Sequence, residues 1–286
     1  MSLLSMTLPY LTFRRPLRHL GLVLVLCLAT SSSFAQSYAH ATEQPHKILF
    51  VGNSYTYYNS LPQLVKAVAE AQRPGLAVEV KFIGGGGAAL ETHWEVGEAL
   101  EEIRSGKWDT VVLQEQSMLG ANDPKDPYKP DLFWEYARKF DQEIRQAGAD
   151  PVYYMTWSRR DKRPDQRYLT DAYLAIANEL GSRVAPVGLA WDAVRDSLEM
   201  ELYVPDGSHP TVLGSYLAAL TIARTIFETD FTGVSGNLRG REILRGGALS
   251  PGKRQLSDLS DGEVAFLKRG VELGFLGLTE RQSSQH

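Results

Sequence analysis

The chain has 286 residues, of which 43% are hydrophobic and 22% charged, so it carries enough apolar sequence for a folded domain with a sizeable core. Its 34 acidic side chains outnumber its 30 basic ones, which gives a formal charge of −4 at pH 7. This balance excludes a strongly basic protein that holds nucleic acid through its charge.

The N-terminal 35 residues have the pattern of a secretory signal peptide. Arg14, Arg15 and Arg18 precede an apolar run at 20–29, and Ser33-Phe34-Ala35 matches a small-x-small cleavage motif. The apolar run is about half as long as the roughly 20 residues that a membrane span needs. We therefore expect cleavage after this motif and a secreted or periplasmic protein with no stable membrane insertion.

The mature chain, 36–286, would contain no cysteine, because Cys27 lies in the apolar run. It would have no residue for disulfides, thiolate catalysis or a zinc-cysteine site. Loss of the three arginines leaves 27 basic against 34 acidic side chains, a formal charge of −7. This charge argues against nucleic acid or an anionic membrane as the main partner.

Short apolar segments alternate with helical patterns through most of the mature chain. The predicted strands cover 48–51, 76–83, 109–114, 151–157 and 184–188. The predicted helices cover 61–71, a stretch from the glycine run to about 103, 132–147 and 168–180. Such alternation implies right-handed crossovers, and it predicts an α/β fold, a three-layer α/β/α sandwich with a five-stranded parallel sheet.

Two segments interrupt this alternation. Residues 122–131 contain three prolines and three aspartates, which predicts a surface loop. The tail after 229 is rich in glycine and arginine as far as 252, and 258–273 has a helical pattern. We predict a single domain over 36–286, in which 228–286 form a C-terminal extension that either caps the domain or is partly mobile.

Polar residues and glycines follow the first three predicted strands. In a parallel α/β sheet ligands bind outside the carboxyl ends of the strands, so these residues should share one rim. Gly52-Asn53-Ser54 follows the first strand, glycines 84–87 follow the second, and Gln114 and Gln116 lie at the end of the third. A fourth segment, DGSH at 206–209, precedes an apolar helix.

A catalytic triad can be assembled from the first and last of these segments. Ser54 follows a strand and a glycine, so it would be a nucleophile on a tight turn. His209 would take the proton of the Ser54 hydroxyl, and Asp206 would hold the imidazole and stabilise its positive charge. Each motif alone is common in turns, and their order along the chain is what favours hydrolysis.

These motifs resemble those of the SGNH hydrolases, also called GDSL esterases. GNS at 52–54 resembles the first block of the family, glycines 84–87 its second block and DGSH at 206–209 its last. The resemblance covers about 47–227 and implies the flavodoxin-like SGNH hydrolase fold, with Ser54, Asp206 and His209 as the triad. VGNSYT, VVLQEQS, MTWSRR and DGSHPTVLGSYLAAL together are similar to a bacterial branch with glutamine in the third block.

The sequence departs from the family pattern at two places. Asn53 replaces the aspartate of the first block, at a position that we expect to support the loop. LQEQS at 113–117 replaces the GxND of the third block, so a glutamine amide would have to serve as an oxyanion donor. Gln116 is preferred because it lies nearer the rim, and Gln114 is the alternative on the same strand face.

The resemblance also implies backbone donors for the oxyanion. The N–H of Ser54 would be one of the unpaired donors at a helix start. Among the glycines we prefer Gly87, because its N–H precedes the following helix, and Gly86 is the alternative. The predicted oxyanion hole thus comprises Ser54, Gly87 and Gln116.

Aromatic rings near the predicted strand ends could stack on a sugar or an acyl group, although core packing would explain most of them. They are Tyr55, Tyr57, Tyr58, Trp94 and Trp157. Trp157 is the predicted substrate contact, because it ends a strand on the rim.

His93, between Glu91 and Glu95, is interpreted as part of a solvated helix surface, because residues two apart on a helix do not face the same way. Arg159 and Arg160 are interpreted as solvated surface charges, with binding of an anionic substrate group as the alternative.

The sequence therefore predicts a secreted serine esterase that hydrolyses carboxylic esters through an acyl-enzyme. Export, negative charge and rim aromatics favour removal of acetyl groups from glycans, with a small-molecule or glycan ester as substrate and no nucleic acid partner. No metal or organic cofactor is expected. The alternative is a non-catalytic carbohydrate-binding protein on the same fold, because the third block lacks the family asparagine.

Overall fold

The computed structural model describes residues 44–118, 130–197, 200–228, 230–244 and 247–283. The predicted signal peptide at 1–35 and most of the predicted loop at 122–131 lie outside these residues. No helix among the described residues combines the length and the apolar character that a membrane crossing requires.

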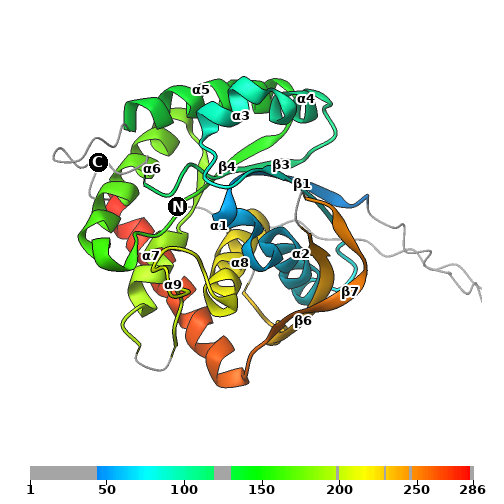
Figure 1. The fold of residues 1–286 in the computed structure, drawn as a ribbon, viewed down its shortest axis with the longest axis vertical. Helices are drawn as coiled ribbons and strands as arrows, with labels where there is room; N and C mark the ends of the chain where they lie inside the picture. Colours follow the sequence, from blue (N-terminus) through cyan, green and yellow to red (C-terminus); the bar gives the residue numbers. More distant parts are fainter. Residues whose placement is uncertain (1–43, 119–129, 198–199, 229, 245–246, 284–286) are drawn as a thin grey trace, which may run out of the picture. The chain divides into compact units, whose positions relative to one another are not determined.

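A parallel sheet of five strands forms the centre of the described domain, in the order β2-β1-β3-β4-β5 (Figure 1). The strands are β1 (His46–Gly52), β2 (Val78–Gly84), β3 (Thr110–Leu113), β4 (Asp150–Tyr154) and β5 (Arg183–Ala185). The chain moves to one side after β1 and to the other after β2, so a crevice is expected at the carboxyl ends of β1 and β3.

Helices cover both faces of this sheet, which confirms the predicted three-layer sandwich. Along β1, Ile48 and Phe50 face one layer and Leu49 and Val51 face the other, as the period of two requires. The second layer contains α3 (Leu90–Val96), α4 (Glu98–Arg104), α5 (Pro130–Gln146) and α6 (Gln166–Leu180). The first contains α2 (Leu61–Gln72), α7 (Val187–Val194), α8 (Val212–Phe227) and α9 (Asp261–Ser283).

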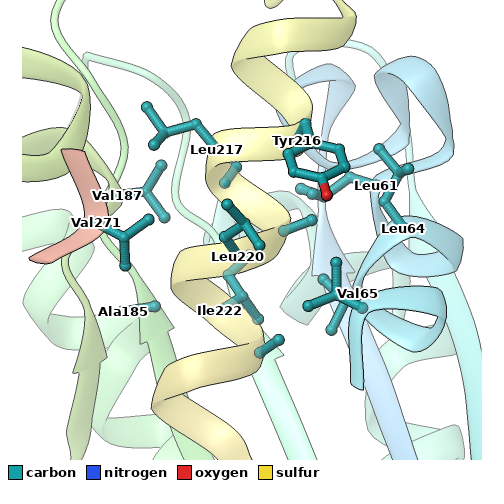
Figure 2. Close-up of a cluster of buried hydrophobic side chains, with 14 of the residues drawn as sticks. Leu61, Leu64, Val65, Ala185, Val187, Tyr216, Leu217, Leu220, Ile222 and Val271 are labelled. Carbon is teal, nitrogen blue, oxygen red and sulfur yellow. The ribbon is translucent and has the colours of Figure 1, made fainter. Parts of the chain in front are cut away.

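Helix α8 is buried along most of its length and lies in the core of one layer. Figure 2 shows Tyr216 of α8 beside Leu61 of α2, and Leu217 of α8 toward Val187. The Tyr216 hydroxyl donates to the carbonyl of Ser235 at 2.8 Å. Because α8 is fixed by apolar contacts on several sides, the residues just before it are held against the rim of the sheet.

The prediction of the fifth strand, at 184–188, is wrong beyond Ala185. Strand β5 ends at Ala185, and α7 begins at Val187. Pro186 lies between them and has no N–H with which to continue a strand ladder, so the strand stops there. The predicted strand extends to 188 because α7 begins with apolar residues.

The C-terminal extension contains a β-hairpin that sequence analysis missed. Strands β6 (Asn237–Ile243) and β7 (Leu249–Asp258) pair antiparallel, and the hairpin lies beside α2 (Figure 1). Helix α9 is longer than the predicted helix at 258–273. Its Leu267 and Val271 are fully buried in the core, beside α7 and α8.

Candidate active site

Two glycines allow the carboxyl ends of β1 and β2 to approach closely. A Cβ atom on Gly84 would lie 2.1 Å from the carbonyl oxygen of Gly52. A Cβ atom on Gly52 would lie 2.6 Å from Oγ1 of Thr56 and 2.7 Å from Oε1 of Gln114. Only glycine fits at these positions, and the chain can therefore turn directly from β1 into α1 (Ser54–Tyr57).

Asn53 supports this turn, as the sequence predicted for its position. Its Oδ1 accepts a hydrogen bond from the N–H of Tyr55 at 3.1 Å and thereby caps α1. Its Nδ2 donates to the carbonyl of Ala88 at 2.9 Å, and its N–H donates to Oε1 of Gln114 at 2.9 Å. Asn53 thus joins the Ser54 turn to the glycine run and to the segment after β3.

The structure brings the three residues of the predicted triad together. The Oγ atom of Ser54 lies 2.9 Å from Nε2 of His209, although 155 positions separate the two residues in the chain. Nδ1 of the same imidazole lies 2.6 Å from Oδ2 of Asp206. These distances and this order of contacts suit a relay in which the imidazole takes the hydroxyl proton.

Hydrogen bonds fix the protonation pattern of this relay. A carboxylate oxygen only accepts, so Nδ1 of neutral His209 carries the proton and Nε2 accepts from the Ser54 hydroxyl. Oδ1 of Asp206 accepts from the N–H groups of Ser208 and His209 at 2.8 and 2.9 Å. Partial burial raises the pKa of Asp206, but hydrogen bonds from His209 and Ser208 outweigh it and lower the pKa below its usual value.

Two tyrosine rings hold the imidazole. The ring of Tyr58 stacks on His209 with centroids 4.4 Å apart and an interplanar angle of 18°. The ring of Tyr55 meets His209 at its edge, at 5.7 Å and 73°, and its hydroxyl lies 2.7 Å from Oγ of Ser208. Sequence analysis noted both tyrosines only as possible rim aromatics.

Asn59 ties the segment after Ser54 to the His209 loop. It has a left-handed backbone conformation with φ of 50°, which asparagine adopts more readily than most residues. Its Nδ2 donates to the carbonyl of Pro210 at 3.1 Å and to Oγ of Ser215 at 2.9 Å. This residue was not predicted from the sequence, since a single asparagine carries no pattern that would reveal it.

A cleft of about 350 Å³ opens beside the triad. Ser54 and His209 line it, together with Gly86, Gly87 and Gln116. The structure therefore brings both glycine alternatives to the cleft, and Gly87 has a φ of +71° that favours glycine. As the first residue of α1, Ser54 has an N–H group without an intrahelical acceptor.

The two glutamines of the third block have different environments. Gln114 is fully buried, and its Oε1 accepts hydrogen bonds from the Asn53 N–H and from Oγ1 of Thr56 at 2.8 Å. Gln116 lines the cleft, and its Oε1 accepts from the N–H of Met118 at 2.8 Å. The geometry therefore favours Gln116 over Gln114 as a group that can reach a substrate.

Glu115, between Gln114 and Gln116, is a buried acid that was not predicted from the sequence. Its Oε1 accepts hydrogen bonds from the N–H groups of Gln116 and of Leu90, the latter at 3.3 Å. Burial raises the pKa of its carboxyl to about 7, against the lowering effect of these hydrogen bonds. Glu115 thus bridges the third block and the helix that follows the glycine run. An acid at the end of a buried strand was the signal that could have revealed it.

Trp157 is not positioned as predicted, and its assignment as a substrate contact is corrected. Its side chain is fully buried. The ring is stacked between Tyr55, at 4.5 Å, and Trp191, at 3.9 Å, and its Nε1 donates to the carbonyl of Ser208 at 3.0 Å. Strand β4 ends at Tyr154, so Trp157 lies three residues beyond the strand, beside the loop that carries Ser208.

His93 is likewise buried and is not on a solvated surface, which corrects that interpretation. Its Nε2 lies 2.9 Å from the carbonyl oxygen of Gly52, so this nitrogen carries a proton and donates. Burial lowers the pKa of His93 and favours its neutral form. In the described part of the chain, no group of three or more His, Cys, Asp or Glu side chains could hold a metal ion.

Neither the protein-family models nor the curated proteins include a match to the chain. Several solved structures are similar to it. A protein of Slackia heliotrinireducens, described as a candidate SGNH hydrolase, is 30% identical, with 64% of this chain and 100% of that chain covered and a TM-score of 0.55. A mutant of Axe2, an acetyl-xylooligosaccharide esterase from Geobacillus, is 18% identical, with 64% and 94% covered and a TM-score of 0.51.

The acetyl xylan esterase AlAXEase has a TM-score of 0.50 at 14% identity, with 62% of this chain and 97% of that chain covered. At such identities the two esterases share the fold alone. The Slackia protein is both more similar in sequence and matched over its whole length. The chain therefore belongs to the SGNH hydrolase superfamily.

Proposed function

We propose that this hydrolase is an exported esterase that works through an acyl-enzyme on Ser54 and removes acetyl groups from glycans. The relay from Ser54 through His209 to Asp206, with contacts of 2.9 and 2.6 Å, is the observation that carries the proposal. The signal-peptide pattern at 1–35 supports export.

The reaction begins when Oγ of Ser54 attacks the ester carbonyl and Nε2 of His209 takes its proton. Asp206 accepts from Nδ1–H throughout and stabilises the imidazolium that forms. The imidazolium then protonates the leaving alcohol, and the acyl group stays on Ser54. Water deprotonated by His209 hydrolyses this ester, which releases the acid and restores the hydroxyl.

The negative charge on the tetrahedral intermediate needs donors in the cleft. We assign this role to the N–H groups of Ser54 and Gly87 and to the side-chain amide of Gln116, all three of which line the cleft. The bridge through Glu115 supports this assignment, because it ties the Gln116 N–H to the start of α3.

Three observations support an acetylated glycan as substrate. The cleft is small, at about 350 Å³, which suits a short acyl group. Tyr57 and Tyr58 line it, and tyrosine rings are suited to contact with a sugar. Two proteins of the same fold are described as esterases of acetylated xylan or xylo-oligosaccharides.

Ser54→Ala tests the proposal, with Ser117→Ala as the control because Ser117 is a second serine in the same cleft. We expect Ser54→Ala to lose turnover of p-nitrophenyl acetate and labelling by a fluorophosphonate probe while keeping the thermal unfolding temperature of the wild type. Ser117→Ala should keep its labelling. Equal labelling of Ser54→Ala and wild type would instead favour another nucleophile. Glycan binding by a wild type that the probe does not label would favour a non-catalytic binding protein.

A further inference from the structure

A second cavity, of about 710 Å³, adjoins the catalytic cleft. One wall consists of Tyr57, Tyr58, Phe82 and the glycines 84–86, and the other includes Ile243 and Leu244 at the end of β6. We call this cavity the hairpin groove. Tyr57, Tyr58 and Gly86 line both the groove and the catalytic cleft, so one ligand can occupy both.

The hairpin wall of this groove is held in a defined position. The N–H of Ile243 donates to Oγ of Ser60 at 2.9 Å, and Ser60 directly precedes α2. A Cβ atom on Gly240 would lie 2.6 Å from Cδ1 of Leu256, which shows how closely the two strands pack. The hairpin is therefore joined to the helical segment that begins with the nucleophile.

The described lining indicates a ligand with both apolar and polar faces. Three aromatic rings line one wall, with Tyr57 and Phe82 in edge contact at 6.0 Å. Tyrosine hydroxyls and the exposed glycine backbone offer hydrogen bonds, which an acyl chain would leave unpaired but the hydroxyls of a sugar would satisfy.

We propose that the hairpin groove binds a sugar residue in the alcohol part of the ester, while the acetyl group lies in the cleft beside Ser54. This proposal rests on the proposed function and extends it. It assigns substrate recognition to the C-terminal hairpin, because Leu244 and Ile243 supply the outer wall.

Leu244→Arg tests this assignment, because it places a long charged side chain at the wall of the groove. Leu276→Arg is the matched control, since Leu276 is also an exposed leucine but lies on α9. The substrates are p-nitrophenyl acetate, p-nitrophenyl octanoate and a panel of acetylated neutral oligosaccharides of xylose, glucose, mannose and galactose.

We expect Leu244→Arg to lower kcat/KM at least about 10-fold on the best oligosaccharide and to leave p-nitrophenyl acetate unchanged. Leu276→Arg should change neither. Equal loss on all substrates, no loss on any, or a selective loss on the octanoate would overturn the proposal, and the last result would assign the groove to an acyl chain.

The same variants separate this proposal from the proposed function. If the wild type neither hydrolyses p-nitrophenyl acetate nor reacts with a fluorophosphonate, the proposed catalysis fails. Calorimetric binding of the deacetylated oligosaccharides by wild type and Leu244→Arg then still tests the groove. Binding that weakens about 10-fold in Leu244→Arg supports the sugar subsite, and binding that is absent or unchanged contradicts it.

Discussion

Two neighbouring glutamines illustrate how burial separates a structural role from a catalytic one. Gln116→Ala should lower kcat on p-nitrophenyl acetate by about 10²- to 10³-fold, because it removes one proposed oxyanion donor. Gln114→Ala should instead lower the free energy of unfolding by about 1–3 kcal/mol, because the buried Asn53 N–H loses its acceptor. Steady-state kinetics and urea denaturation of both variants measure the two effects. A Gln116→Ala enzyme with unchanged kcat would contradict the assignment.

Glu115 gives the stability of the protein a specific dependence on pH. Its carboxyl has a pKa of about 7 in the fold and an ordinary value of 4.5, so between these values the unfolded chain binds fewer protons. The contribution of Glu115 to the free energy of unfolding is therefore present at low pH and is lost as the pH rises to about 7. This loss lowers the free energy of unfolding by on the order of 3 kcal/mol.

Glu115→Gln removes this titration and keeps an oxygen that can accept from the Gln116 and Leu90 N–H groups. We expect the free energy of unfolding of the variant, relative to wild type, to increase between about pH 4.5 and pH 8. Urea denaturation at several pH values checks it. If the free energies of unfolding of the two proteins changed with pH in the same way, the fold would not raise the pKa of Glu115.

At the level of single residues, the sequence predicted the groups that belong to a family motif. Ser54, Asp206 and His209 could be proposed because their order matches the blocks of the SGNH hydrolases. Trp157 was misplaced because its burial depends on rings from other segments, Tyr55 and Trp191. No spacing rule relates such partners, so their contacts were visible only in the structure.

Helix α9 packs against α7 through glycines. A Cβ atom on Gly274 would lie 2.7 Å from the backbone nitrogen of Ala190, whereas one on Gly277 would meet only Cδ1 of Leu189 at 3.9 Å. Gly274→Ala should therefore lower the free energy of unfolding by about 1–3 kcal/mol through overpacking. Gly277→Ala should raise it by up to about 1 kcal/mol through helix propensity. Urea denaturation compares them, and equal effects would refute a close α7–α9 contact.

The sequence predicted the elements of the parallel sheet better than those of the extension. Buried parallel strands are continuous apolar runs, and such a run at Ile48–Val51 is easily recognised. In β6 and β7 most side chains are polar or glycine, and only one face of the hairpin is covered. The alternation in these strands is therefore weak, and the glycine and arginine content suggested an irregular tail.

For the molecule as a whole, the extension completes the core. A chain that ends at Phe227 would lose α9 and leave the apolar face of α7 uncovered. We expect it to aggregate or to lose cooperative thermal unfolding, as measured by circular dichroism and limited proteolysis. A soluble truncated protein that melts at the wild-type temperature would contradict this.

The distance along the chain between Ser54 and His209 has a consequence for biosynthesis. Ser54, the proposed nucleophile, is synthesised 155 residues before His209, its proposed base, so a nascent chain cannot form the proposed relay until His209 has been made. Since α9 is made later still and supports α7 and α8, ester cleavage should begin only after the last helix has docked. We therefore expect that unfinished chains do not cleave esters.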